Sequence, residues 1–449
     1  FLNRQALDQA KLRLSSSKVF LENVLASMAD ANNVNLDGFQ GWYQQAGTPQ
    51  LRVRRYAVDD ASHLLLSLSQ QIPDTAAQTP RNALPISLRL AFLDQQGKIV
   101  PTNLAADAPA QDEHVILLTE EHLEQSIYAP QVANLTPSIL RNFSAPVVVD
   151  DDLSSDERRH IMRYDTDLFN RWDSAQTLVS DEILAIAADP KAAVNSDSFV
   201  ALADGVSHIL DDPNCLDYFK AAILTLPAIS VLESHMTPAD PVALFNARLA
   251  FEAALAQHLH GHYQAALDPK KSAQLADTAG GRALLNRLLA LAVAAGDAQA
   301  DERAMAHVLD SNMTVSQGAL AAVNNRSLAV REKGLAIFHD RWRSNALVLE
   351  KWFSFESMSC ISGSISRLQE LMKHPSFDPT NPNKLRVVLG SFMNGNPVKF
   401  YAEDGSGFEF IADCLIDIDK RNSQLAARMA LPLTRMGAYS DARQQQMRR

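Results

Sequence analysis

The spacing of apolar residues changes twice along this chain of 449 residues, and this change limits the folds that it can adopt. Between residues 51 and 128 apolar and polar residues alternate, as they do around Leu64, Leu66 and Leu68. Alternation with period two is typical of strands that bury one face, and several short strands at regular spacing predict a small β-sandwich. On both sides of this block the apolar residues recur with the period of a helix.

Glycine and proline mark the limits of the predicted sandwich. Ala46-Gly47-Thr48-Pro49 breaks the first helical stretch, because Gly and Pro interrupt regular structure and Pro49 biases Thr48 away from helix. After Pro146 helix follows helix with short loops and no strict repeat, which predicts an irregular α-α superhelix of helix pairs. The chain is therefore predicted to be multidomain and mainly α-helical, with a short helical segment at 1–46, a small β-sandwich at 47–145 and a superhelix at 146–449.

Two sites carry the residue pattern of a helix N-terminus. Ser154, with Glu157 three residues later, has the sequence of a capping box. Asp240 and Pro241 combine an N-cap residue with proline at the first helical position. The acidic run 150–152 precedes the first site. It fits either a metal site or, as we favour, solvated carboxylates at the positive end of a helix dipole.

Composition excludes several classes of partner and site. Lys and Arg number 41 against 52 Asp and Glu, a net charge of -11, so the surface repels phosphate backbones and nucleic acid is not an expected partner. No apolar run is long enough for a transmembrane helix, so no membrane is expected. Cys215, Cys360 and Cys414 form no Cys-x-x-Cys pair, which argues against a thiolate zinc site and predicts small buried residues in a reducing compartment.

The sequence contains no complete catalytic motif. A His-Glu-x-x-His helix would place two imidazoles and a carboxylate at one zinc ion, and the chain has no such sequence. His258, His260 and His262 lie close together, but Glu252 falls on another part of the helix surface, so we interpret them as a surface cluster near a helix end. No serine nucleophile elbow or phosphate loop is present. We therefore assign no catalytic residue and no metal ligand to this chain.

Several segments resemble the aminopeptidase N family, especially its bacterial alanyl aminopeptidase branch of zinc metallopeptidases. The strongest resemblance lies in Ala402-Glu403-Asp404-Gly405-Ser406-Gly407-Phe408 and in the segment from Asn422 to Arg428. The Trp42-Tyr43 pair before Gly47-Thr48-Pro49 resembles the link that leaves the catalytic domain of that family. The remaining similar segments keep the family's order and spacing, at residues 143–147, 167–176, 381–386 and 396–397. One departure is Tyr401, where histidine is common.

The resemblance implies a fold and a role. Residues 1–46 would be the tail of the catalytic domain, followed by the family's β-sandwich and its C-terminal helical domain, cut at its end. The zinc ligands would lie upstream of Phe1, so zinc would belong to the parent enzyme and this segment would bind none. Arg386, Gln424 and Arg428 stand at positions that line the substrate cavity in the family, and an arginine can grip a peptide carboxylate with its planar fork.

Two functions follow as hypotheses. In the first, the chain is the C-terminal part of a cytoplasmic, monomeric zinc aminopeptidase, and it caps the cavity in which N-terminal residues are hydrolysed from peptides. Its partners would be peptide substrates and the missing N-terminal and catalytic domains. In the second, the chain is a catalytically inactive remnant that binds peptides or a protein through the concave face of its superhelix. In both, the segment alone should be inactive.

Overall fold

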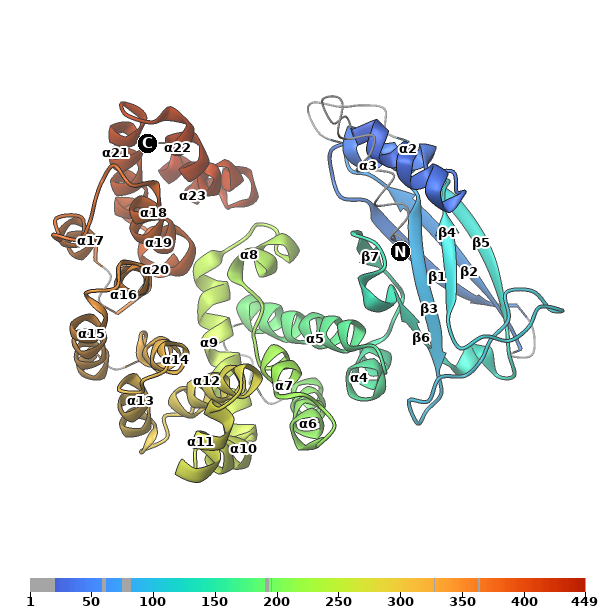
Figure 1. Cartoon of the computed structure of the whole chain (residues 1–449), viewed down its shortest axis with the longest axis horizontal. Helices are drawn as coiled ribbons and strands as arrows, with labels where there is room; N and C mark the ends of the chain where they lie inside the picture. The colour runs from blue at the N-terminus through green and yellow to red at the C-terminus, as the bar shows by residue number, and fades with distance from the viewer. Residues whose placement is uncertain are drawn as a thin grey trace. The chain divides into compact units, whose positions relative to one another are not determined.

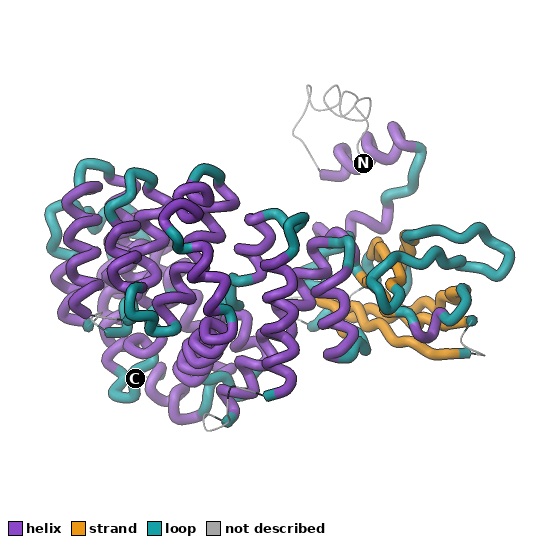
Figure 2. Tube along the Cα trace, turned by 90° about the horizontal axis from the view of Figure 1, so that it is seen from below, coloured by secondary structure: helices purple, strands orange, loops and turns teal. Residues whose placement is uncertain are grey.

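A computed structural model describes residues 21–58, 62–74, 82–189, 194, 196–326, 328–361 and 364–448. The chain forms two compact units, which divide between Ser174 and Ala175. In the first unit, the predicted helical segment contains α2 (Leu21–Asn32), the 3-10 turn η1 (Asp37–Gln40) and α3 (Gly41–Gln44), while its residues 1–20 lie outside the described residues. Figures 1 and 2 show that strands occur in the first unit and that helices make up the second.

The first unit contains the predicted β-sandwich. Its strands are β1 (Gln50–Ala57), β2 (His63–Gln71), β3 (Ile86–Leu93), β4 (His114–Leu118), β5 (His122–Tyr128), β6 (Thr136–Ile139) and β7 (Val148–Asp150). They form one sheet in the order β5-β2-β1-β7 and another in the order β4-β3-β6. Short 3-10 turns, η2 (Val132–Asn134) and η3 (Arg141–Phe143), lie in its loops.

The alternation in the sequence corresponds to one buried face on each sheet. In β2, Leu64, Leu66 and Leu68 point inward, and the residues between them are partly exposed. The facing sheet contributes further buried residues, including Leu90 and the larger Phe92. Burial of such side chains contributes about 1.5–3 kcal/mol each and is the main force that holds the two sheets together.

The structure corrects the interpretation of the acidic run 150–152 as solvated carboxylates at a helix dipole. Because β7 pairs in parallel with β1, Asp150 lies opposite Arg52 and forms ion pairs with Arg52 and Arg54 at 2.9 and 2.8 Å. Asp151 is buried rather than solvated and pairs with Arg158 at 2.5 Å. These carboxylates are thus neither a metal site nor free at the helix dipole, because arginine side chains neutralise them.

Helices begin after the capping box that the sequence predicts. Ser154 accepts a hydrogen bond from the backbone N–H of Glu157, and the Glu157 carboxylate accepts one from the backbone N–H of Ser154, which confirms the box. The helices that follow are α4 (Ser155–Tyr164), α5 (Leu168–Ala188), α6 (Asp197–Asp211), α7 (Asp217–Ile223), α8 (Ile229–Leu232), α9 (Pro241–His258), α10 (His260–Ala266), α11 (Pro269–Ala276), α12 (Ala279–Ala294) and α13 (Ala300–Val308).

The second half of the helical unit continues in the same manner. Its helices are α14 (Met313–Val323), α15 (Leu328–Trp342), α16 (Ala346–Met358), α17 (Ile365–Leu371), α18 (Pro382–Leu385), α19 (Ser391–Gly395), α20 (Pro397–Phe400), α21 (Ser406–Asp419), α22 (Ser423–Met429) and α23 (Asp441–Met447). Shorter turns are η4 (Glu233–His235), the π-helical turn η5 (Arg386–Gly390) and η6 (Leu431–Ala438). A mainly helical chain with a small sandwich is therefore confirmed.

The C-terminal end of the helical unit contacts the segment just before α9. The backbone N–H of Ala239 donates to the carbonyl of Ala438 at 2.8 Å, just before α9 begins at its Asp240 cap. Arg443 of α23 lies 3.7 Å from Asp240. Figure 1 shows α20 beside α9, in agreement with their packing. The C-terminal turns therefore return to a segment that precedes them by about two hundred residues.

No helix within the described ranges is long and apolar enough to cross a membrane.

Candidate functional site: an arginine-lined pocket

The described residues do not fit a zinc ion. Among them no three His, Cys, Asp or Glu side chains gather as a metal site would require. His258 lies 3.0 Å from Asp204 and His262 lies 3.1 Å from Asp211, so each imidazole faces its own carboxylate on α6. The helix also breaks between the two histidines, because α9 ends at His258 and α10 begins at His260.

None of the three cysteines, all within the described ranges, forms a disulfide. Cys215 is buried, as the sequence predicts, whereas Cys360 and Cys414 are half-buried. Burial raises the pKa of the Cys360 thiol to about 11 and that of the Cys414 thiol to about 11. Both therefore remain protonated at neutral pH and are poor nucleophiles.

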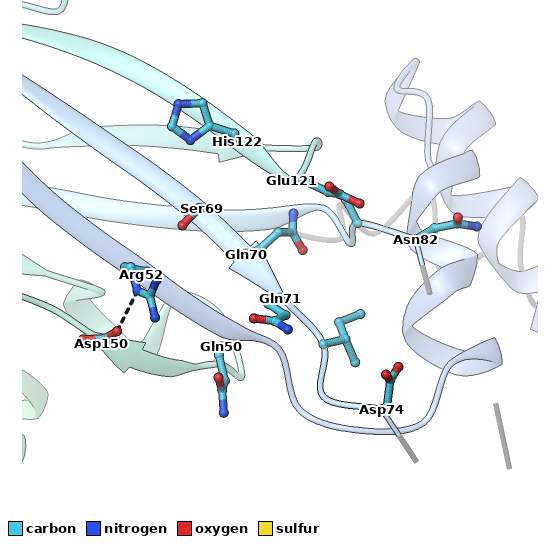
Figure 3. A pocket seen from close by; sticks show the side chains of 12 residues that line it. Gln50, Arg52, Ser69, Gln70, Gln71, Asp74, Asn82, Glu121, His122 and Asp150 are labelled. Atoms are coloured by element: carbon cyan, nitrogen blue, oxygen red, sulfur yellow. Dashed lines mark hydrogen bonds and ion pairs between the residues drawn. The ribbon is translucent and has the colours of Figure 1, made fainter. Parts of the chain in front are cut away.

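One cavity lies on the outer face of the four-stranded sheet and is lined mostly by polar residues. This sheet pocket of about 720 Å³ lies over a row of side chains that crosses the four strands: His122, Ser69, Arg52 and Asp150. Figure 3 shows the ion pair between Arg52 and Asp150 within it. Its arginine is already paired with Asp150, and the other charged residues that line it, Asp74 and Glu121, are acidic, so it offers no free arginine to a peptide carboxylate.

Two of the three predicted site residues line one cavity in the helical unit. The arginine pocket, about 480 Å³, contains Arg386 from the π-helical turn η5 and Arg428 from α22. Gln424 lies one helical turn before Arg428 and is exposed, but it is not among the residues that line this pocket. The structure thus brings Arg386 and Arg428 together and leaves Gln424 at the margin.

The two guanidinium groups lack anionic partners. Arg386 is exposed and reaches only the neutral side-chain oxygen of Asn383, at 3.4 Å. The Arg428 side chain makes no hydrogen bond or ion pair with any residue that the structure describes. Two unneutralised arginines at one cavity form a site for an anion, and a carboxylate matches the geometry of the guanidinium fork.

The rest of the arginine pocket is mainly apolar and adaptable, with Ser391 and Asn394 as its neutral polar residues. Met358, Met393 and Met429 line it together with Pro432. Methionine side chains have several rotatable bonds and a polarizable sulfur, so they can fit ligands of different shapes. No local pattern in the sequence indicates these residues, because they come from α16, α19, α22 and η6 and meet only in the folded chain.

A π-helical turn places Arg386. Helices α18 and α19 form one continuous rod through η5, which begins with Arg386. An extra residue in a helical turn locally changes the direction of side chains, and such turns are frequent at functional sites. Gly395 ends the rod against Met358, where a Cβ atom would lie 2.4 Å from the Met358 Cγ.

Comparison with known protein families finds two matches. The family described as "Domain of unknown function (DUF3458_C) ARM repeats" matches residues 155–449, and "Domain of unknown function (DUF3458) Ig-like fold" matches residues 47–152. Together they cover the sandwich and the helical unit. The matched ranges do not test the domain boundaries predicted after residues 46 and 145, which stay predictions.

Named relatives cover almost the whole chain. Aminopeptidase N of Escherichia coli (strain K12) is 30% identical over 447 residues, which are 97% of this chain and 50% of that protein. Aminopeptidase N of Caulobacter vibrioides is 33% identical over 441 residues, 96% of this chain and 49% of that protein. The chain therefore spans about half the length of these relatives.

A solved structure has the same fold. The crystal structure of Legionella pneumophila aminopeptidase A in complex with aspartic acid superposes with a TM-score of 0.82 at 24% sequence identity. The match covers 98% of this chain and 51% of that one.

Proposed function

Because the chain belongs to the DUF3458_C family of ARM-repeat domains and is homologous along its length to the C-terminal half of bacterial aminopeptidase N, we propose that it forms the cap and wall of a peptide cavity. The reaction of the whole enzyme would be zinc-dependent hydrolysis of N-terminal residues from peptides. The zinc and its ligands would come from the part of that enzyme outside this chain.

The arginine pocket carries this proposal. Arg386 and Arg428 supply two positive charges without acidic partners among the described residues, in a pocket that three methionines also line. A peptide carries a carboxylate and apolar side chains, so it complements both parts of the pocket. In a peptidase, holding the far end of the substrate would fix the position of its N-terminus and so favour the reacting geometry.

A binding measurement on the 449-residue chain tests this assignment. We expect a short peptide with a free C-terminal carboxylate to bind about tenfold more tightly than its C-terminal amide, since a tenfold ratio corresponds to about 1.4 kcal/mol for an exposed charged pair. The double variant Arg386→Gln with Arg428→Gln should remove this difference. Arg421→Gln is the matched control, because Arg421 is also exposed but pairs with Asp417 and lines none of these cavities.

Equal binding of the acid and the amide by the unaltered chain would overturn the assignment. So would a double variant that retains the preference for the acid. Isothermal titration calorimetry gives both affinities directly.

An activity assay distinguishes the two hypotheses, that the chain is part of a zinc aminopeptidase or that it is an inactive peptide-binding scaffold. The isolated chain should not hydrolyse aminoacyl anilides with or without added zinc, and turnover should be restored when the chain is joined to the catalytic half of a relative such as the Caulobacter vibrioides protein. If the joined protein stays inactive while peptide binding is retained, the chain is a peptide-binding scaffold. A cytoplasmic, monomeric form with no nucleic acid partner also belongs to this proposal, and size-exclusion chromatography with light scattering tests the monomer.

A further inference from the structure

A second cavity adjoins the arginine pocket. This Glu233 pocket, of about 430 Å³, shares the lining residues Met393, Asn394 and Pro432 with the arginine pocket, so the two are neighbours. It lies where the C-terminal turn η6 returns to α8 and η4. A ligand held at Arg386 and Arg428 would therefore lie next to the pocket that Glu233 lines.

The carboxylate of Glu233 is largely buried and only partly satisfied. Its side chain is 11% exposed, and its Oε2 accepts a hydrogen bond from Arg435 at 3.1 Å. Its Oε1 has no hydrogen-bond donor among the residues that the structure describes. Oε1 is not one of the fully buried oxygens, so it is open to the pocket that Glu233 lines and presents an acceptor to whatever enters it.

The surroundings of Glu233 leave its charge under-compensated. Burial raises the pKa of the Glu233 carboxyl, and the opposing effect of Arg435 does not restore it to the usual value. Arg435 is itself 54% exposed, so water screens its charge. The hydroxyls of Tyr401 and Tyr439 bond to each other at 2.8 Å, and among the described residues neither forms a hydrogen bond with the Glu233 carboxylate.

The walls of the Glu233 pocket suit an aliphatic stem. Pro397, Leu431 and Pro432 provide apolar surface beside Glu233. A lysine or arginine side chain buries its methylene groups along such a surface and places its charged end at a polar group. A carboxylate with one free acceptor oxygen supplies that polar group.

We propose that the Glu233 pocket binds the cationic side chain of a lysine or arginine in a peptide whose C-terminal carboxylate lies between Arg386 and Arg428. This inference rests on the proposed function and adds a preference for basic peptides. Glu233 would thus be a specificity-determining residue. Arg435 would turn aside toward solvent or share the carboxylate with the incoming cation.

Titration of matched peptides into the 449-residue chain tests the inference. Two series of short peptides carry either Lys or Gln at the last or the penultimate position, each as the free acid. We expect the Lys peptide to bind about tenfold more tightly than the Gln peptide at one of these positions, as expected for a charge-assisted hydrogen bond at a buried carboxylate. Glu233→Gln should abolish this ratio and leave the preference for the free acid over the amide unchanged.

Arg435→Gln is the matched control. It removes the other charge of the same ion pair, so it should retain or increase the preference for Lys, whereas a merely structural role of the pair would make both variants behave alike. Equal binding of Lys and Gln peptides by the unaltered chain, or a Lys preference that persists in Glu233→Gln, would overturn the inference. If the acid-over-amide preference is present in that case, the proposed function stands. If that preference is also missing, both fail.

Discussion

Asp165 has a side chain with no exposed surface, and it holds the guanidinium of Arg141, 7% exposed, at 2.7 Å. Asp165 also accepts a hydrogen bond from Ser138 of β6, so a residue between α4 and α5 is fixed to the three-stranded sheet. This ion pair therefore ties the C-terminal end of α4 to the sandwich, within the first unit.

Removal of one partner of this pair should be strongly destabilising. We expect Asp165→Ala to cost about 3 kcal/mol, because it breaks a buried ion pair while Arg141 keeps its other ion pair, with Glu113 at 2.8 Å. Hydrogen exchange followed by mass spectrometry should show the loss in the sandwich and α4, with little change in α13 to α16. Unchanged protection of the sandwich would contradict this expectation.

A second buried ion-pair network lies in the helical unit, and we expect it to respond to substitution in a similar way. Glu356, 2% exposed, accepts hydrogen bonds from Arg331 at 2.8 Å and Arg367 at 2.6 Å. Glu356→Ala should cost about 3–5 kcal/mol, whereas the apolar pair Arg331→Met with Glu356→Leu should cost much less, because no charge is left buried and unpaired. Chemical denaturation monitored at Trp352, next to this network in α16, measures both. A double variant as unstable as the single one would refute the argument.

Because of Glu113, the unfolding free energy of the sandwich should decrease as the pH becomes acidic. Burial alone would raise the pKa of the Glu113 carboxyl, but hydrogen bonds from Arg89 and Arg141 outweigh it and hold the pKa below its usual value. A lowered folded-state pKa gives stability that is present above the unfolded pKa and is lost as the pH falls toward the folded pKa.

The variant Glu113→Gln reports this dependence. We expect it to lower the unfolding free energy by about 1 kcal/mol near pH 7, since the carboxylate accepts charge-assisted hydrogen bonds at a partly exposed site. The difference between the two proteins should shrink below about pH 4.5, where the unfolded carboxyl becomes protonated. Melting temperatures of both proteins between pH 3.5 and pH 7, in about half-unit steps chosen to span that pKa, test the prediction. A constant difference over this range would disprove it.

Two glycines should respond in opposite directions to alanine. A Cβ atom at Gly407 would lie 2.3 Å from the backbone oxygen of Phe400, so Gly407→Ala should cost about 1–3 kcal/mol through overpacking. At Gly261 nothing lies within 4 Å, so Gly261→Ala should be neutral or stabilise α10 by up to about 1 kcal/mol. Urea unfolding of the two variants side by side decides this, and equal effects would argue against the close contact at Gly407.

The sandwich was largely predictable because each long strand buries one face. Alternation at Leu64, Leu66 and Leu68 follows directly from that geometry. The strand β6 is different, because it spans four residues, contains Pro137 and buries three residues in succession, so no alternation marks it. The three-residue strand β7 is too short to show a period in the sequence. The ion pairs of Asp150 depend on the pairing of β7 with β1, so the sequence did not indicate them either.

The candidate site was predictable only in part. The resemblance to a family indicated Arg386 and Arg428, and the fold places both at one pocket. Glu233 and Arg435 carry no signal in the sequence, since 202 residues separate them and each resembles an ordinary surface charge in its own helix. Periodicity reports which face of a helix is buried, but it does not report which distant helix covers that face.

The return of η6 and α23 to the segment before α9 also constrains how this chain can vary. An open solenoid tolerates the gain or loss of a repeat, since each unit touches only its neighbours. Here an added helix pair anywhere between α10 and α17 would carry Ala438 away from Ala239 and pull the Glu233 pocket open. Homologous chains that keep this junction should therefore conserve their number of helices, and insertions should accumulate in the loops instead.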